Sequence, residues 1–211
     1  MKRTVGLVFG LIALLIGCVG TRSSLQTSIA GSSLSPSVEG SRIYFVPLGD
    51  FSPAQLDSMV QFYRQRYGLE ISVLKAVPID DGVRDSSRQQ VIAEKLLATL
   101  RTGAPNLAND GRAILIGFTS EDIYPASQNW PFCFSWRDAN AHTAVVSTAR
   151  LNLHRDSAPF AADISATRLR KVVTKDIGVL YYGLPQNANA KSVMFQFVVG
   201  IDDLDQVSED F

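Results

Sequence analysis

Hydrophobic and polar positions change in blocks along the first half of the chain, and each block predicts one element. The apolar run 43–48 ends at a Gly-Asp pair and predicts a buried strand. Apolar residues then recur every three or four positions from Pro53 to Tyr67, which predicts a helix with Ser52 as its capping residue. A second strand is predicted over 69–77, after a glycine that ends the helix.

The same alternation repeats once more. A second helix is predicted to follow a cap at Asp85 or Ser86 and to end at Gly103. Its expected buried positions are Val91, Ile92, Leu96 and Leu100. Residues 112–118, an arginine followed by six apolar or glycine residues, form the strongest strand pattern of the chain. Strands that alternate with helices indicate a sheet with parallel neighbours and helices packed on it.

The pattern changes after this strand. Two short strands, 132–136 and 143–147, are predicted to form a hairpin at one edge of the sheet. A last, long helix is expected over 165–182, ended by Gly183. The fold class is therefore α/β (α+β), with a mixed, partly parallel sheet, packed helices and a long C-terminal helix.

The first seventeen residues have the pattern of a secretory signal. Two basic residues precede the apolar run 5–16, which is shorter than the roughly 20 residues that span a membrane. Its end, Leu15-Ile16-Gly17-Cys18, resembles the bacterial lipobox, which implies cleavage before Cys18 and lipidation of its thiol. We therefore expect a lipoprotein in the cell envelope, with the membrane as a partner through its lipid anchor. Val19 after the cysteine favours the outer membrane.

Composition then divides the remaining chain. Residues 18–40 are rich in Ser, Gly and Thr and contain no aromatic residue, so a flexible linker is predicted there, followed by one globular domain over 41–211. The chain has 20 basic and 20 acidic residues, which gives no electrostatic case for a nucleic-acid partner. With Cys18 lipidated, Cys133 is the one remaining thiol. It is expected to be a buried small hydrophobic residue.

Several phrases, in their order along the chain, resemble the archaemetzincins, a branch of the metzincin zinc peptidases. Residues 43–50 (IYFVPLGD) resemble the opening strand of that family, and 114–125 (ILIGFTSEDIYP) its third strand with the following acidic loop. Residues 144–151 (AVVSTARL) resemble its edge strand. Residues 192–205 (SVMFQFVVGIDDLD) are similar to the stretch with the metzincin methionine turn, which would make Met194 the turn methionine. The resemblance extends from residue 43 to the C-terminus and implies a metzincin-like fold.

The family's zinc motif, H-E-x-x-H-x-x-G-x-x-H, is degenerate in this chain. If the two are aligned on a shared glycine of the last helix, Lys175 and Val179 replace the first two histidines and Asp176 replaces the glutamate. Gln186 stands where the third histidine would come, and the turn glycine is one residue late, at Gly183. An ammonium and an isopropyl group are not zinc ligands, so no metal and no catalytic residue are expected at these positions.

Other candidate chemistry is sparse. His142 and His154 do not have a ligand-type spacing, and we expect them to be ordinary loop histidines. The nearby carboxylates are expected to be solvated or capping groups, namely Glu121, Asp122, Asp202, Asp203 and Asp205. No G-x-S-x-G, P-loop or dinucleotide motif is present, and no cofactor is expected.

The favoured hypothesis is a membrane-anchored lipoprotein with a catalytically inactive, archaemetzincin-like domain in a binding or envelope-structural role. An extended peptide or an envelope protein is its expected partner, bound by strand addition at the sheet edge. Two alternatives stay open: an active zinc peptidase with unconventional ligands, and an unrelated small α/β domain. The favoured hypothesis predicts that Val179 is largely buried. It also predicts that the Lys175 ammonium reaches water or a carboxylate such as Asp176.

Overall fold

Five strands form the central sheet of the computed structural model, which describes residues 34–152 and 161–211. The predicted signal peptide, Cys18 and His154 lie outside the described residues. Across the sheet the order is β2 (Ile71–Val73), β1 (Arg42–Pro47), β5 (Ala113–Thr119), β8 (Thr143–Ser147) and β7 (Ser135–Asp138). β1, β2, β5 and β8 are parallel, and only β7 runs antiparallel, beside β8. The predicted mixed, partly parallel sheet with an edge hairpin is confirmed.

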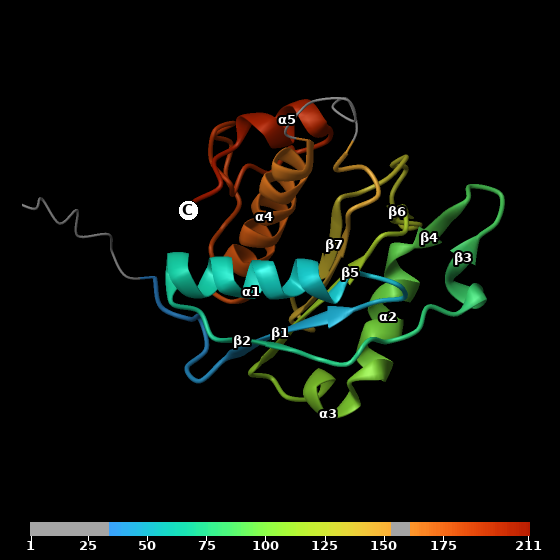
Figure 1. Cartoon of the computed structure of the whole chain (residues 1–211), viewed down its shortest axis with the longest axis horizontal. Helices are drawn as coiled ribbons and strands as arrows, with labels where there is room; N and C mark the ends of the chain where they lie inside the picture. Colours follow the sequence, from blue (N-terminus) through green and yellow to red (C-terminus); the bar gives the residue numbers. More distant parts are fainter. Residues whose placement is uncertain (1–33, 153–160) are drawn as a thin grey trace, which may run out of the picture. The chain divides into compact units, whose positions relative to one another are not determined.

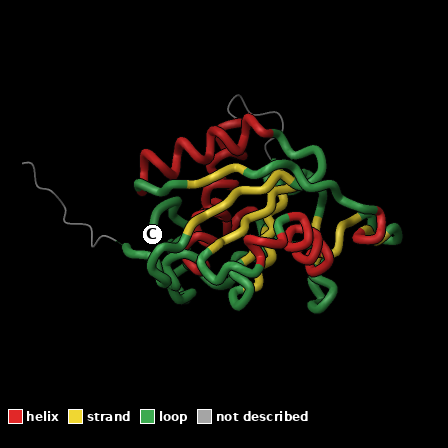
Figure 2. The backbone as a smooth tube through the Cα atoms, turned by 90° about the horizontal axis from the view of Figure 1, so that it is seen from below, coloured by secondary structure: helices red, strands yellow, loops and turns green. Residues whose placement is uncertain are grey.

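Helices cover both faces of this sheet (Figures 1 and 2). On one face α1 (Pro53–Tyr67) and α4 (Ala161–Leu180) pack into a core with Phe45, Ile116 and Val146. On the other face α2 (Ala93–Gly103) packs against a second core that includes Leu115 and Val145. Side chains that alternate along β5 and β8 thus enter the two cores in turn, and β5 is buried along its whole length.

A small second sheet corrects one prediction. Its strands are β3 (Arg84–Asp85), β4 (Gln90–Ile92) and β6 (Ile123–Tyr124), in that order, after the short 3-10 helix η1 (Asp81–Val83). Neither Asp85 nor Ser86 caps α2, which begins at Ala93, and Val91 pairs with Ile123 instead of continuing a helix. An apolar run of this length fits either element, and the available strand partner decided the outcome.

Smaller differences concern caps and lengths. Ser52 precedes α1, but its side chain makes no capping hydrogen bond. The second strand is only Ile71–Val73, much shorter than predicted. Two short helices were not predicted, α3 (Pro105–Ala108) and α5 (Ile201–Gln206). α5 matters for function, because it follows the segment that faces α4.

The last residues of the predicted linker contact the folded part of the chain. The backbone N–H of Ser37 donates to the carbonyl of Tyr181 over 2.8 Å, and its hydroxyl donates to the same oxygen over 3.0 Å. This carbonyl lies just after α4, where Gly183 has the left-handed φ of 65° that ends the helix. Residues 34–40 are therefore attached to the end of the long helix.

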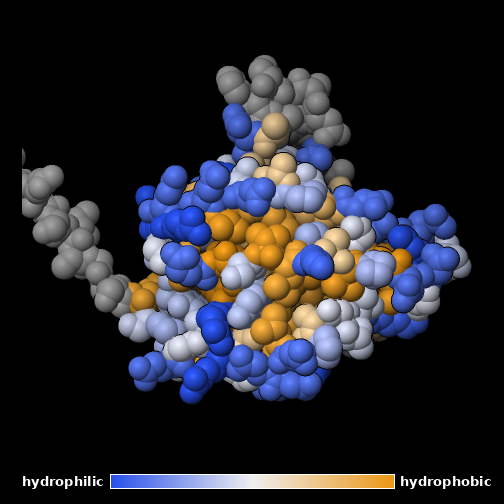
Figure 3. All heavy atoms as spheres, turned by 60° about the horizontal axis from the view of Figure 1, so that its bottom comes forward, coloured by the Kyte–Doolittle hydropathy of each residue, from blue (hydrophilic) through white to orange (hydrophobic). Residues whose placement is uncertain are grey.

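Apolar side chains are also found on the surface. Figure 3 shows one face on which hydrophobic residues gather in the middle and hydrophilic residues surround them. Among the described residues, the large hydrophobic side chains with substantial exposure include Trp130, Phe197 and Val199. Within 34–152 and 161–211, no helix has the length and apolar character needed to cross a bilayer.

Candidate functional site

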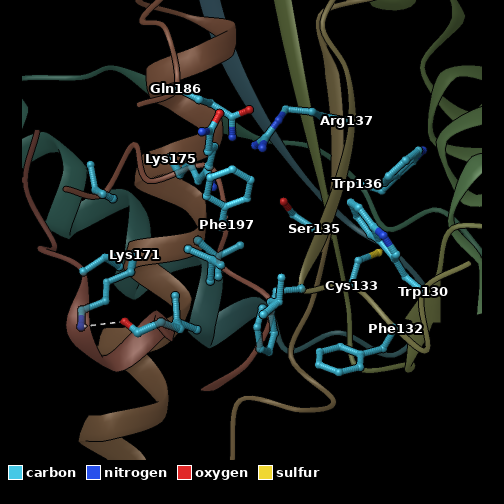
Figure 4. A pocket seen from close by; sticks show the side chains of 18 of the residues that line it. Trp130, Phe132, Cys133, Ser135, Trp136, Arg137, Lys171, Lys175, Gln186 and Phe197 are labelled. Atoms are coloured by element: carbon cyan, nitrogen blue, oxygen red, sulfur yellow. Dashed lines mark hydrogen bonds between the residues drawn. The ribbon is translucent and has the colours of Figure 1, made fainter. Parts of the chain in front are cut away.

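A pocket of about 450 Å³ lies beside α4 and the edge strand β7 (Figure 4). One wall is β7 with the loop before it, which contributes Trp130 and Phe132. The other wall is α4 with the segment that follows Met194, which contributes Phe197 and Val199. Polar groups gather at one end of the pocket, where Figure 4 shows Arg137 extending from the strand side towards Gln186 and Lys175.

Asp176 lies fully buried on α4 behind this polar end. Its Oδ1 accepts a hydrogen bond from the Ser135 hydroxyl over 3.2 Å and forms an ion pair with the Arg137 guanidinium. Its other oxygen is buried and has no hydrogen-bond partner among the described residues. Burial raises the pKa of the Asp176 carboxyl, and Arg137 opposes that rise. This pair attaches β7 to α4.

Lys175, the next residue along α4, points into the pocket. Its ammonium donates to the carbonyl oxygen of Phe195, in the segment that follows Met194. Of the two predicted outcomes, water or a carboxylate such as Asp176, the carboxylate is wrong, because Asp176 pairs with Arg137 and the ammonium bonds a backbone carbonyl. Burial, and then the nearby Arg137, lower the pKa of Lys175 from 10.5 to about 8. The fold thus keeps this ammonium in a place that disfavours its charge.

The structure brings together some of the positions singled out in the sequence and not others. Lys175 and Gln186 line the same pocket, whereas Val179 does not line it. Val179 is mostly covered and packs against the core that contains Val173 and Ile177, in agreement with the prediction that it is largely buried. Met194 is buried against the helix, since a Cβ placed on Gly178 would lie 2.6 Å from its sulfur. The segment that resembles the methionine turn therefore packs against the last helix.

Two cations of α4 hold the second wall in place. The Lys171 ammonium donates to the carbonyls of Leu204 and Asp205, each over 3.0 Å, at the C-terminal end of α5. Arg168 binds both carboxylate oxygens of Asp205 at 2.8 Å. Since cations stabilise the C-terminal end of a helix, these contacts fix α5 and the segment before it against α4.

Three of the remaining carboxylates named in the sequence have structural roles, and Asp202 is exposed. Glu121 pairs with Arg84, and Asp122 with Arg150. Asp203 accepts hydrogen bonds from the backbone amides of residues 199 and 200, before α5. They do not converge on the pocket, and within 34–152 and 161–211 no three His, Cys, Asp or Glu residues are grouped as metal ligands.

The other candidate side chains are also accounted for by the fold. Cys133 is buried in the pocket wall, and burial raises the pKa of its thiol to about 12, which leaves it un-ionised at neutral pH. His142 lies in the turn between β7 and β8, with a positive φ of 52°. It does not line the pocket.

Arg137 is the site residue that the sequence analysis missed. The predicted strand 132–136 stops one residue before it, whereas β7 continues to Asp138 and places Arg137 on the face that meets α4. The sequence contains one indication that a cation lies near Asp176. Asp176 lies on the buried stripe of the last helix, and a buried carboxylate requires a cationic or hydrogen-bonding partner.

Relatives with sequence similarity share one description. The archaemetzincin of Natronomonas pharaonis is 30% identical over 152 residues, which are 71% of this chain and 83% of that protein. The archaemetzincin of Haloquadratum walsbyi is 33% identical over 158 residues, again 71% of this chain and 83% of that protein. No family model matches the chain.

Solved structures with the same fold agree with these relatives. The archaemetzincin of Archaeoglobus fulgidus, complexed with malonate, has a TM-score of 0.64 and 22% identity, covering 81% of this chain and 94% of its own. The zinc-dependent peptidase of Methanocorpusculum labreanum has a TM-score of 0.68 and 18% identity, covering 80% and 95%. At these identities the structures show the fold, and the sequence relatives show the family. The chain belongs to the archaemetzincin family.

Proposed function

We propose that this chain is a membrane-anchored lipoprotein whose archaemetzincin domain binds an extended peptide and does not hydrolyse it. The observation that supports this most directly is the pair of cations, Lys175 and Arg137, at the polar end of the pocket. In the family, the motif positions represented here by Lys175, Val179 and Gln186 would provide the zinc ligands.

The donor groups of this site do not fit zinc. A catalytic zinc requires three protein ligands that are neutral imidazoles or anions, with one position left open. At the aligned positions this chain has an ammonium, an isopropyl group and an amide, while Asp176 is already bound to Arg137. Two neighbouring positive charges would also repel a dication. No step of a zinc mechanism can therefore be assigned to these residues.

The edge strand β7 supports a role in peptide binding. The backbone carbonyl of Phe134 accepts a ladder hydrogen bond from the Ser147 amide over 2.9 Å. Because backbone groups alternate in direction along an antiparallel strand, those of Trp136 also point towards β8. Those of Ser135 and Arg137 point away from β8, towards the outer edge of the sheet. Both of these residues line the pocket. Within residues 34–152 and 161–211, no strand pairs with β7 on this side. Such an edge, beside a pocket with apolar walls, is suited to adding one extended chain that hydrogen-bonds to the strand.

Metal content tests the non-catalytic part of this proposal. The full chain, purified in detergent, should contain no stoichiometric zinc by mass spectrometry and should not cleave a mixture of quenched fluorescent peptides, with or without added zinc. His142→Ala is the matched variant, because it removes one of the two histidines of the chain. One zinc per chain, especially zinc lost in His142→Ala, would favour a peptidase with unconventional ligands and refute the proposal.

The anchor is tested separately. Cys18→Ser should abolish labelling with radioactive palmitate and leave the precursor uncleaved, because the lipidated thiol is the substrate of the processing step that the lipobox implies. Cys133→Ser is the control, since that thiol is buried in the pocket wall. Full labelling of the Cys18→Ser protein would show that no lipid is attached at this position.

A further inference from the structure

The charged side chains that line the pocket are all of one sign. They are Arg137, Lys171 and Lys175, and no aspartate or glutamate is among the lining residues. Most of the other lining residues are aromatic or aliphatic. A ligand that fits this pocket should therefore combine an apolar body with an anionic group.

Two of the three cations are free to bind such a group. Lys171 is committed to α5, where its ammonium bonds the carbonyls of Leu204 and Asp205. Figure 4 marks one of these bonds. Lys175 has three N–H donors, of which one binds the carbonyl of Phe195, and Arg137 has five, of which the ion pair with Asp176 occupies only part. The amide of Gln186 lies at the same end of the pocket.

The charge at this end favours an anion. Lys175 and Arg137 carry two positive charges, and Asp176 behind the wall carries at most one negative charge. The two cations are close enough that Arg137 lowers the pKa of Lys175. A carboxylate between them would relieve this repulsion and form charge-assisted hydrogen bonds with both.

We propose that Lys175 and Arg137, with the Gln186 amide, bind the free C-terminal carboxylate of a peptide whose last side chains are apolar. This inference rests on the proposed function of peptide binding and adds which end of the peptide is recognised. The apolar side chains would contact the walls formed by Trp130, Phe197 and neighbouring residues, of which Trp130 is 50% exposed and Phe197 58% exposed.

The edge strand favours a peptide over a free fatty acid. A fatty acid would need only the apolar walls and the cations, whereas the main-chain groups of Ser135 and Arg137 along the free edge of β7 match the hydrogen-bonding groups of an extended peptide. Arg137 thus offers both its guanidinium and its backbone to the same ligand. The terminal carboxylate would lie beside it, at the polar end.

The test compares two forms of one peptide on the full chain in detergent. A fluorescein-labelled hexapeptide (serine, threonine, serine, valine, phenylalanine, valine) is made with a free C-terminal acid and with a C-terminal amide, and binding is followed by fluorescence anisotropy at pH 7. The acid should bind about ten- to a hundredfold more tightly, as expected for charge-assisted hydrogen bonds. Lys175→Gln should lose most of this preference, whereas Lys75→Gln, at an exposed position away from the pocket, should keep it.

The possible outcomes separate the two proposals. Equal binding of acid and amide by the wild-type chain would overturn the carboxylate site and leave peptide binding intact. A preference for the acid that persists in Lys175→Gln would overturn the assignment to Lys175. Binding of neither peptide would overturn peptide binding and this inference together, and saturable binding of decanoate in that case would assign the pocket to a fatty acid.

Discussion

Removing the ammonium from the pocket should make the protein more stable. In Lys175→Met an apolar side chain of similar length replaces the cation, while the stem keeps its contacts along α4. The wild-type ammonium has Arg137 opposite it on β7 and Asp176 next to it on the helix. Its other contact is with the carbonyl of Phe195. A site residue that costs stability is the expected result if ligand binding, and not folding, requires the charge.

The magnitude follows from the pKa of Lys175, lowered from 10.5 to about 8. At 1.36 kcal/mol per pH unit this shift corresponds to roughly 3 kcal/mol of destabilisation by the protonated amine, which solvent screening of the partly exposed ammonium reduces to about 2 kcal/mol. Loss of the hydrogen bond to the Phe195 carbonyl offsets about 1 kcal/mol in the variant. The free energy of unfolding should therefore rise by about 1 kcal/mol at pH 7 in Lys175→Met.

The pH dependence has a definite sign. Because the pKa is lower in the folded state, the unfolded chain binds more protons between about pH 8 and 10.5, and wild-type stability rises with pH through that window. The destabilisation of the folded state by the protonated Lys175 amine is complete below about pH 8 and absent above 10.5. The advantage of Lys175→Met should consequently shrink as the pH is raised from 7 towards 10.

Urea denaturation followed by circular dichroism at pH 7 and at pH 9.5 measures both effects. Lys75→Met is the control, because that lysine is exposed, and its stability should stay close to wild type at both pH values. A Lys175→Met protein that is less stable than wild type at pH 7 would refute the reasoning. So would a stability gain that is the same at both pH values.

Three further predictions concern the rest of the site and the core. Arg137→Met leaves Asp176 buried without its cation and should lower the free energy of unfolding by about 3–5 kcal/mol at pH 7. The loss of stability should be smaller in Arg137→Met/Asp176→Asn, and also at acid pH, where the Asp176 carboxyl is neutral. If urea denaturation gives the same loss in all of these cases, the ion pair does not have the proposed role. The triple variant Lys175→His/Asp176→Glu/Val179→His should melt at a lower temperature and retain no zinc through dialysis, because the third histidine is still missing; one retained zinc per chain would contradict this. Gly117→Ala would place a Cβ 2.6 Å from the nearest leucine carbon and should cost about 1–3 kcal/mol, measured by the same denaturation; an unchanged stability would show that this core adapts.

Local sequence determined the main elements of the fold. The three- and four-residue periodicity predicts α1 with the bounds that it has, Pro53–Tyr67. The strongest strand pattern predicts β5 to within one residue, because a strand buried on both faces needs mostly apolar side chains. The identities of the zinc-motif residues, including Lys175, are also properties of the sequence alone. Periodicity and residue identity concern neighbours along the chain, and so they can be recognised without a structure.

Tertiary structure decided which distant residues meet. Val91 fits a helix or a strand, and its pairing with Ile123 made it a strand. Asp176 required a partner, but only the register of β7 against β8 placed Arg137 opposite it. The pocket, too, combines one wall from residues 130–137 with another from residues 171–207. Such pairings depend on the packing of whole elements, because burial makes an ion pair or a strand partner necessary without specifying which residue provides it.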